Sequence, residues 1–164
     1  MQPTDSRTAG TDLADTIVVG HDGSDDADAA YEYSLRLAER LGSALLVVRA
    51  WTIDTAPHGT LVSHGYVSSF DEASAKVARI LERDATARAS ARPSVEVAYR
   101  AKFGQPASVL IAASVGALML VVARRGRGGF ASLVLGSVSE QCVRHAACPV
   151  LVVRYRQGRG GDET

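Results

Sequence analysis

The sequence predicts an α/β fold, a single doubly wound open sheet of five parallel strands, because apolar strand-like segments alternate with amphipathic helical segments along the chain. The segment 44–48 is apolar on both faces, which is typical of a parallel strand covered by helices on both sides. A length of 164 residues, with 46% apolar and 22% charged residues, fits one globular domain. We therefore expect one sheet with helices packed on both of its faces.

The strands and helices can be assigned in order. A strand is expected at 16–20 and a helix at 25–41, where apolar residues recur at helical spacing until Gly42 ends it. Gly104-Gln105-Pro106 opens a later helix, because proline is tolerated in the first turn. The other expected elements are a strand at 44–48, a long loop at 51–69, a helix beginning at Phe70, a strand at 95–99, and strands at 118–122 and 150–153 joined by a Gly-rich loop and a fourth helix.

The Gly-rich loop after the strand at 118–122 combines backbone freedom with positive charge. Glycine lets a ligand approach the backbone closely, and the arginine guanidinium matches phosphate oxygens. Ser137-Val138-Ser139-Glu140 fits a capping box, so we expect Ser137 to be the N-cap of a helix whose dipole points its positive end into the loop. These features predict a phosphate-binding loop; an ordinary connection with solvated arginines is the alternative. The residues concerned are Gly126, Gly128, Gly129, Gly136, Arg124, Arg125 and Arg127.

The loop contains neither G-x-x-x-x-G-K-[ST] nor G-x-G-x-x-G. The sequence motifs that would indicate a P-loop NTPase or a dinucleotide-binding Rossmann fold are therefore absent from it. It resembles the motif G-x2-G-x9-G-[ST] of ATP-binding members of the universal stress protein family. Gly126 and Gly136-Ser137 match this motif, whereas Ala123 replaces its first glycine. The resemblance extends from Thr16 to Arg154 and includes the family's first strand and turn, Thr16 to Ser24, and its last helix and strand, Gln141 to Arg154.

The resemblance implies a Rossmann-like sheet, similar to that of the adenine-nucleotide α-hydrolases, with strand order 3-2-1-4-5. In such a sheet a ligand binds where the order reverses, between the first and fourth strands. We expect a domain at 16–154 between a disordered lead at 1–15 and a disordered tail at 155–164. The resemblance also implies a homodimer, which we expect to form through the last strand, Val150-Leu151-Val152-Val153, because that strand lies at an unpaired sheet edge.

The ligand that the resemblance implies is an adenine nucleotide, with ATP expected first and AMP or a cyclic nucleotide as alternatives, acting as a regulator in stress response. Mg²⁺, if present, would be held mainly by the phosphates. Asp22 matches an aspartate that contacts the nucleotide, Ala50 matches a backbone contact to adenine, and His21 is a candidate phosphate contact. The full set of expected nucleotide-binding residues is Asp22, Ala50, Ala123, Gly126, Arg127, Gly136, Ser137 and Val138.

The substitution at Ala123 has two possible meanings. The family's glycine either lets the ribose pack directly on the backbone or allows a positive φ angle. Alanine would weaken nucleotide binding modestly in both cases. A dimeric interaction module that binds no nucleotide is therefore an alternative. An enzyme of the related α-hydrolase type would need S-G-G-x-D-S after the first strand, which Gly20 to Ser24 does not provide.

No catalytic or metal-binding residues are expected, so at most slow ATP hydrolysis remains possible. The spacing shows no Ser/His/Asp or paired-carboxylate arrangement. Asp25, Asp26 and Asp28 suit the first turn of a helix, and His58 and His64 have no third ligand at a usable spacing. Protein partners cannot be named from the sequence.

Zero net charge argues against nucleic-acid or membrane-surface binding. The apolar run at 117–123 is too short to span a bilayer, and the first 15 residues contain no apolar signal region, so a cytoplasmic protein is expected. Cys142 and Cys148 are expected to be buried thiols.

Overall fold

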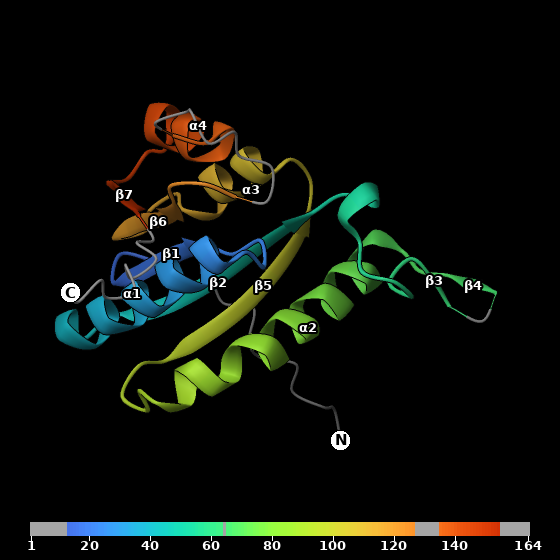
Figure 1. The fold of residues 1–164 in the computed structure, drawn as a ribbon, viewed down its shortest axis with the longest axis horizontal. Coiled ribbons are helices and arrows are strands. Elements are labelled where there is room, and N and C mark those ends of the chain that lie inside the picture. The colour runs from blue at the N-terminus through green and yellow to red at the C-terminus, as the bar shows by residue number, and fades with distance from the viewer. Residues whose placement is uncertain (1–12, 64, 127–134, 155–164) are drawn as a thin grey trace, which may run out of the picture.

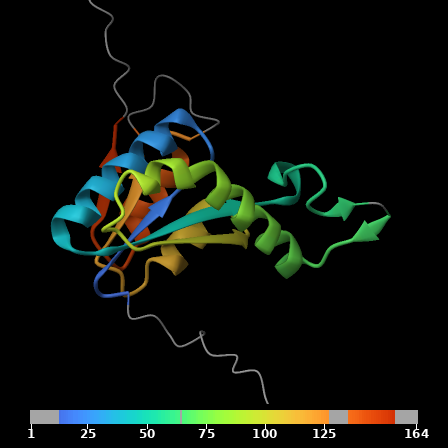
Figure 2. The same ribbon diagram turned by 90° about the horizontal axis from the view of Figure 1, so that it is seen from below.

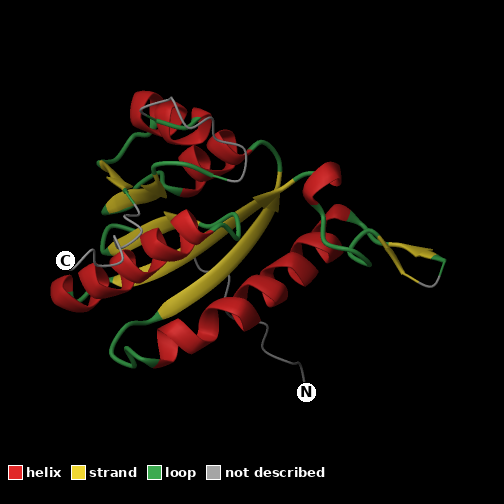
Figure 3. Ribbon diagram, in the orientation of Figure 1, coloured by secondary structure: helices red, strands yellow, loops and turns green. Residues whose placement is uncertain are grey.

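The computed structural model describes residues 13–63, 65–126 and 135–154 of the chain. Its main sheet has five parallel strands in the order β5-β2-β1-β6-β7, which confirms the expected order 3-2-1-4-5. The helices lie in two layers, with α1 and α2 on one face of the sheet and α3 and α4 on the other (Figures 1 and 3). The strands are β1 (Thr16–Gly20), β2 (Ala44–Trp51), β5 (Val97–Phe103), β6 (Met119–Ala123) and β7 (Val150–Val153).

The helices begin and end where their local sequences favour it. In α1 (Asp25–Leu41) the Ser24 side chain caps the Ala27 amide, and Gly42 ends the helix with a φ of 65°. Ser69 and Glu72 form a capping box at the start of α2 (Phe70–Ser90), and Pro106 occupies the first turn of α3 (Pro106–Ala113). The fourth helix is α4 (Ser137–His145).

The core of the described residues has three clusters: one beneath α1 and α2, one on the opposite face of the sheet beneath α3 and α4, and one between α2 and the carboxyl-terminal parts of β2 and β5. Side chains alternate along β1, so that Ile17 and Val19 pack with α1 and α2, while Val18 packs with α3 and α4. These three side chains are completely buried, as expected for the central strand of a covered parallel sheet. The two faces therefore hold β1 and β6 rigidly side by side.

Several expectations about the elements are wrong. The strand expected at 44–48 is β2 and continues to Trp51, and the strand expected at 118–122 is β6, at Met119–Ala123. The strand expected at 95–99 is β5, at Val97–Phe103, because parallel pairing with β2 extends it to Phe103 opposite Trp51. The segment 51–69 is not only a loop, since it contains a short 3-10 helix, η1 (Ile53–Thr55), and an antiparallel hairpin of β3 (Val62–Ser63) and β4 (Tyr66–Val67). Figure 2 shows this hairpin projecting from the body of the domain.

Residues 1–12 and 155–164, which include most of the expected disordered ends, lie outside the described residues. Among the described helices, none is both long and apolar enough to cross a membrane.

Candidate nucleotide-binding site

The candidate site lies where the strand order of the main sheet reverses. β1 pairs with β6 in parallel, with Val19 opposite Val121, so both strands end at the same edge. The chain leaves β1 toward β2 on one side, whereas it leaves β6 toward β7 on the other. Ligands of open α/β sheets bind in the crevice at such a point, and the loops after β1 and β6 both begin there.

The Asp22 carboxylate is held against the backbone of Gly126. Its Oδ1 accepts hydrogen bonds from the Ser24 amide at 2.9 Å and from the Ser24 hydroxyl at 2.6 Å. A Cβ atom on Gly126 would lie 2.7 Å from Asp22 Oδ2, which is closer than real Cβ atoms come. The structure thus brings together two of the expected site residues, one from each loop, and glycine at 126 is required by this close approach.

The start of α4 is tied to the end of β6. The Gly136 amide donates to the Arg124 carbonyl at 2.9 Å, and a Cβ on Gly136 would lie 3.3 Å from that oxygen. The buried Ser139 hydroxyl lies 3.0 Å from the Arg124 carbonyl and 2.9 Å from the Gly136 carbonyl, to which it can donate. Sequence analysis missed this role of Ser139; a serine in the first turn of a helix was the available signal.

The expected capping box at this helix is wrong. Gly136 is the N-cap, with φ −75° and ψ 162° and no side-chain cap, and Ser137 is the first helical residue. The Ser139 hydroxyl bonds the Arg124 and Gly136 carbonyls, which places the helix start one residue earlier than the Ser137 cap would. The amides of Ser137, Val138 and Ser139 therefore form the first turn, where backbone N–H groups have no carbonyl acceptor within the helix.

Positive charge gathers beside this helix start. Arg124 and Arg125 follow β6 directly, and Arg154 follows the neighbouring strand β7. The pKa of Arg124 is lowered from its usual value, first by partial loss of water and then by repulsion from Arg125 and Arg154. A bound anion would relieve that repulsion. Arg127, the third arginine of the expected motif, lies outside the described residues.

Ala123 is the last residue of β6 and pairs with Val153. Its backbone is extended, so the explanation that this position needs a positive φ is wrong, because any residue can adopt a strand conformation. The Ala123 side chain packs against the core cluster beneath α1. Ala50 lies in β2 opposite Lys102, and its side chain and that of Val138 pack against the cluster beneath α3 and α4.

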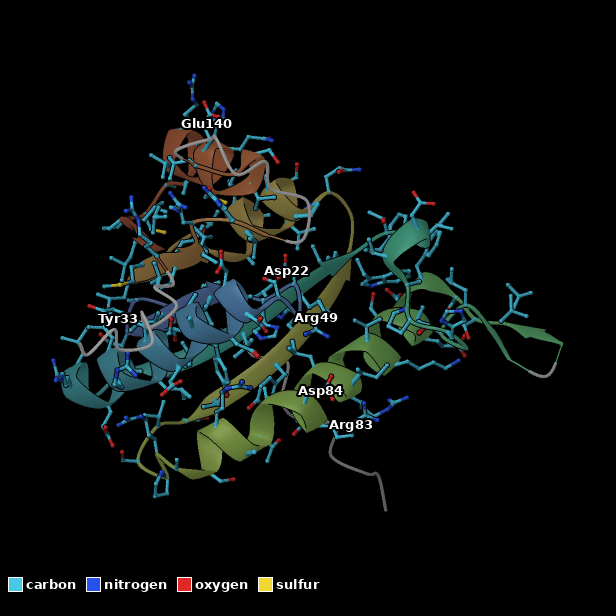
Figure 4. All side chains as sticks on the ribbon, viewed as in Figure 1. Asp22, Tyr33, Arg49, Arg83, Asp84 and Glu140 are labelled. Atoms are coloured by element: carbon cyan, nitrogen blue, oxygen red, sulfur yellow. The ribbon has the colours of Figure 1, made fainter. Side chains whose placement is uncertain are left out.

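His21 is buried, and both of its ring nitrogens bond protein groups. Nε2 lies 2.9 Å from Asp28 Oδ1, and Nδ1 lies 2.8 Å from Arg49 Nη2. The expectation that His21 contacts phosphate is therefore wrong. Figure 4 shows Asp22, in the turn after β1, close to Arg49 of β2, and Arg49 is a second residue that sequence analysis missed.

Within the described residues, no group of three or more histidine, cysteine, aspartate or glutamate side chains could hold a metal ion. Asp28, one of the acids in the first turn of α1, bonds Arg88 at 2.9 Å in addition to His21. Cys142 is buried and Cys148 half-buried; burial, together with Cys148, raises the pKa of the Cys142 thiol to about 11.

Comparison with known proteins identifies the family. The family model of the universal stress proteins matches residues 14–154. A universal stress protein of Thermus aquaticus is 35% identical over 144 residues, which cover 85% of this chain and 98% of that protein. One of Mycolicibacterium smegmatis is 30% identical over 142 residues, covering 85% of this chain and 46% of that longer protein.

Solved structures of universal stress proteins resemble this chain as well. A crystal structure of a universal stress protein in complex with cAMP has a TM-score of 0.62 and 26% identity, and covers 85% of this chain and 95% of that one. A family member from Burkholderia pseudomallei has a TM-score of 0.58 and 28% identity, with coverages of 86% and 96%. The chain belongs to the universal stress protein family.

Proposed function

We propose that this protein is cytoplasmic and binds an adenine nucleotide, with ATP favoured. The nucleotide would act as a regulatory ligand in the stress response. The observation that carries the proposal is the contact between the Asp22 carboxylate and Gly126, at the point where the strand order reverses. This contact supports the proposal, because the Asp22 carboxylate could accept hydrogen bonds from ribose hydroxyl groups while the phosphates lie toward the end of β6.

Under this proposal each part of the ligand would meet a different group of the protein. The triphosphate is negatively charged and suits the first amides of α4 together with Arg124 and Arg125, because a helix N-terminus and nearby cations both stabilise anions. Arg127, by its place in the motif, would add a further cation. The backbone of Ala50, near the end of β2, would contact the adenine ring. Mg²⁺ would be carried by the phosphates, since it binds readily to phosphates with few protein oxygens.

The relative solved in complex with cAMP supports an adenine nucleotide as the ligand class. The proposal includes no catalytic step, because a general base positioned by a second side chain is not part of the described site. Slow hydrolysis of ATP would be a separate property.

We further propose that the protein forms a homodimer through β7. Among the described strands this one pairs with β6 alone, and all four of its side chains are apolar and half-buried. The opposite edge strand, β5, carries Arg100 and Lys102, and charged residues discourage edge pairing. A second copy of β7, related by a twofold axis, would cover the apolar edge.

A second candidate function is a dimeric interaction module that binds no nucleotide. The observation that favours it is Ala123, which replaces the first glycine of the family motif. Under this alternative the loop after β6 would contact a protein partner instead.

The test is to purify the protein without added nucleotide, denature it by heat, and identify any released nucleotide by chromatography and mass. Titration calorimetry with ATP, AMP and cAMP would follow on nucleotide-free protein. We expect saturable binding of at least one, with ATP the tightest. Absence of released nucleotide together with absence of heat for all three ligands would contradict the proposal and favour the interaction module.

A further inference from the structure

The tautomer of His21 follows from its two neighbours. The Arg49 guanidinium can only donate hydrogen bonds, so His21 Nδ1, 2.8 Å from Arg49 Nη2, must be the acceptor. The proton of a neutral ring is then on Nε2, which donates to Asp28 Oδ1 at 2.9 Å. His21 is therefore held as a neutral ring with one defined tautomer.

The same groups hold the backbone that carries Asp22. The His21 amide donates to the Val48 carbonyl at 2.9 Å, and Arg49 Nε donates to the His21 carbonyl at 3.1 Å. Arg49 thus bonds both the backbone and the ring of the residue immediately before Asp22. The Asp22 carboxylate accepts hydrogen bonds from the amide and the hydroxyl of Ser24, so both the backbone and the side chain of this turn are bonded.

The network is anchored in the helical layer on the same face. Arg88 of α2 donates to Asp28 Oδ2 at 2.9 Å, which fixes the carboxylate that accepts from His21. The Tyr31 ring of α1 meets the His21 ring edge-on, with centroids 6.1 Å apart, and the Tyr31 hydroxyl bonds that of Tyr99 at 3.0 Å. Burial raises the pKa of Tyr31, so this neighbour stays neutral.

We propose that neutral His21 is a positioning residue, which together with Arg49 aims the Asp22 carboxylate at the nucleotide and makes nucleotide binding sensitive to acid. The proposal rests on the proposed function, because it assumes that Asp22 contacts the ligand. It extends that function by naming a chain-specific device that regulates the site.

Protonation would break the arrangement at a defined atom. The second proton must go to Nδ1, which would then face the Arg49 N–H group with a donor instead of an acceptor. Arg49 would release the ring, and its bond to the His21 carbonyl would be strained. The charged groups facing the ring are Asp28 from α1, Arg49 from β2 and Asp22 from the adjoining turn.

The pH range of this effect follows from the surroundings of the ring. Burial lowers the pKa of His21 below its usual value of 6.5; the hydrogen bond to Asp28 opposes this shift and Arg49 adds to it. The ring is therefore neutral at physiological pH. Binding should be complete above the lowered pKa and weaken as the pH falls through it.

The experiment measures the dissociation constant for ATP by calorimetry between pH 8 and pH 5 on four proteins. These are the unaltered chain, His21→Asn, His21→Leu and the control His145→Gln, which alters an exposed histidine at the end of α4. Titration of the ATP phosphates is common to all four and cancels in the comparison. Amide NMR spectra of the nucleotide-free proteins check the fold and follow Asp22 and Ser24.

As the pH falls, we expect the unaltered chain and His145→Gln to lose affinity for ATP by the same amount. Both His21 variants should lose only the part that titration of the ATP phosphates causes. Asparagine can place an acceptor near the position of Nδ1, so His21→Asn should bind ATP more tightly than His21→Leu at pH 8, by about tenfold or ~1.4 kcal/mol. The proposal is overturned if the His21 variants keep the pH profile of the unaltered chain. It is also overturned if His21→Asn and His21→Leu bind ATP with equal affinity at pH 8.

Failure of the proposed function would be recognised separately. If the unaltered chain binds none of ATP, AMP and cAMP at any pH, the nucleotide assignment is wrong, and the NMR spectra still decide the positioning role. Movement of the Asp22 and Ser24 amide signals with the titration of His21 supports that role, whereas signals that stay fixed overturn it.

Discussion

Gly126 is needed because of its neighbour across the site, since a Cβ there would lie 2.7 Å from Asp22 Oδ2. Gly126→Ala should displace the Asp22 carboxylate and weaken ATP binding by about tenfold, or ~1.4 kcal/mol. Calorimetry checks this. In an Asp22→Ala background the same change should have little further effect, because residues that act through one contact are not additive. Full additivity of the two changes would show that the contact plays no part in binding.

Ala123 is a position where the structure changes the expected effect of a mutation. Its backbone is extended and its methyl group packs against the core beneath α1, so reverting it to glycine removes packing rather than strain. Ala123→Gly should lower the free energy of unfolding by about 0.5–1 kcal/mol, because glycine in a strand costs backbone entropy. The affinity for ATP should change by less than about threefold. A gain of tenfold or more in calorimetry would instead show that the methyl group obstructs the nucleotide.

His21 also affects stability. Its pKa is lowered in the folded protein, so between the unfolded value near 6.5 and the lowered value only the unfolded chain binds the proton. The free energy of unfolding should be highest above pH 6.5 and should fall as the pH drops through this window. Urea unfolding at several pH values, with His21→Asn as the comparison, measures the contribution of this residue. An equal decline in both proteins would assign the loss to other groups.

Some residues of the candidate site could be identified from the sequence, and others could not. Asp22, Gly126 and Gly136 could be singled out because they match a motif and follow strands that end at one edge. Arg49 and Ser139 could not, because their roles depend on which carbonyl oxygens lie within reach after folding. His21 looked suited to phosphate, since nothing in the spacing shows that Asp28 and Arg49 bond both ring nitrogens.

At the scale of the element, strands and helices with strong local signals were predicted well. β1, α1 and β7 have the expected bounds, because buried apolar runs, a serine cap and a terminating glycine all act locally. The N-cap of α4 was placed wrongly at Ser137, whereas Gly136 is the N-cap, and β5 was placed early. Both errors arise where partners distant in sequence decide the boundary, namely the Arg124 carbonyl and the strand β2.

The outer edge of β7 carries the prediction for the dimer. Leu120 N bonds Pro149 O and Arg124 N bonds Val153 O, so alternate residues of β7 face β6, and the Val152 N–H faces outward. Val152→Pro should therefore leave the pairing with β6 intact and remove a donor needed by a second copy. Light scattering should show a dimer for the unaltered protein and a monomer for the variant. A monomeric unaltered protein at micromolar concentration would contradict the interface.

At the scale of the molecule, the two helical layers bury most of β1 and the centre of β6, and so fix the distance between the loops that leave them. One loop presents the Asp22 carboxylate, and the other joins Gly126 to the start of α4. The rigid sheet thus holds an acceptor and a cationic helix start at one edge. The central claim is that an adenine nucleotide binds between these two loops.

Amide NMR spectra recorded while ATP is added to nucleotide-free protein test this claim most directly. We expect the largest saturable shifts at Asp22, Gly126, Ser137 and Val138. A basic hollow between α2 and the loop before β3, lined by His58, Thr60, Lys76 and Arg79, serves as the internal comparison. Its signals should move little. Shifts concentrated in that hollow, or no saturable shift at the turn after β1 and the start of α4, would contradict the account.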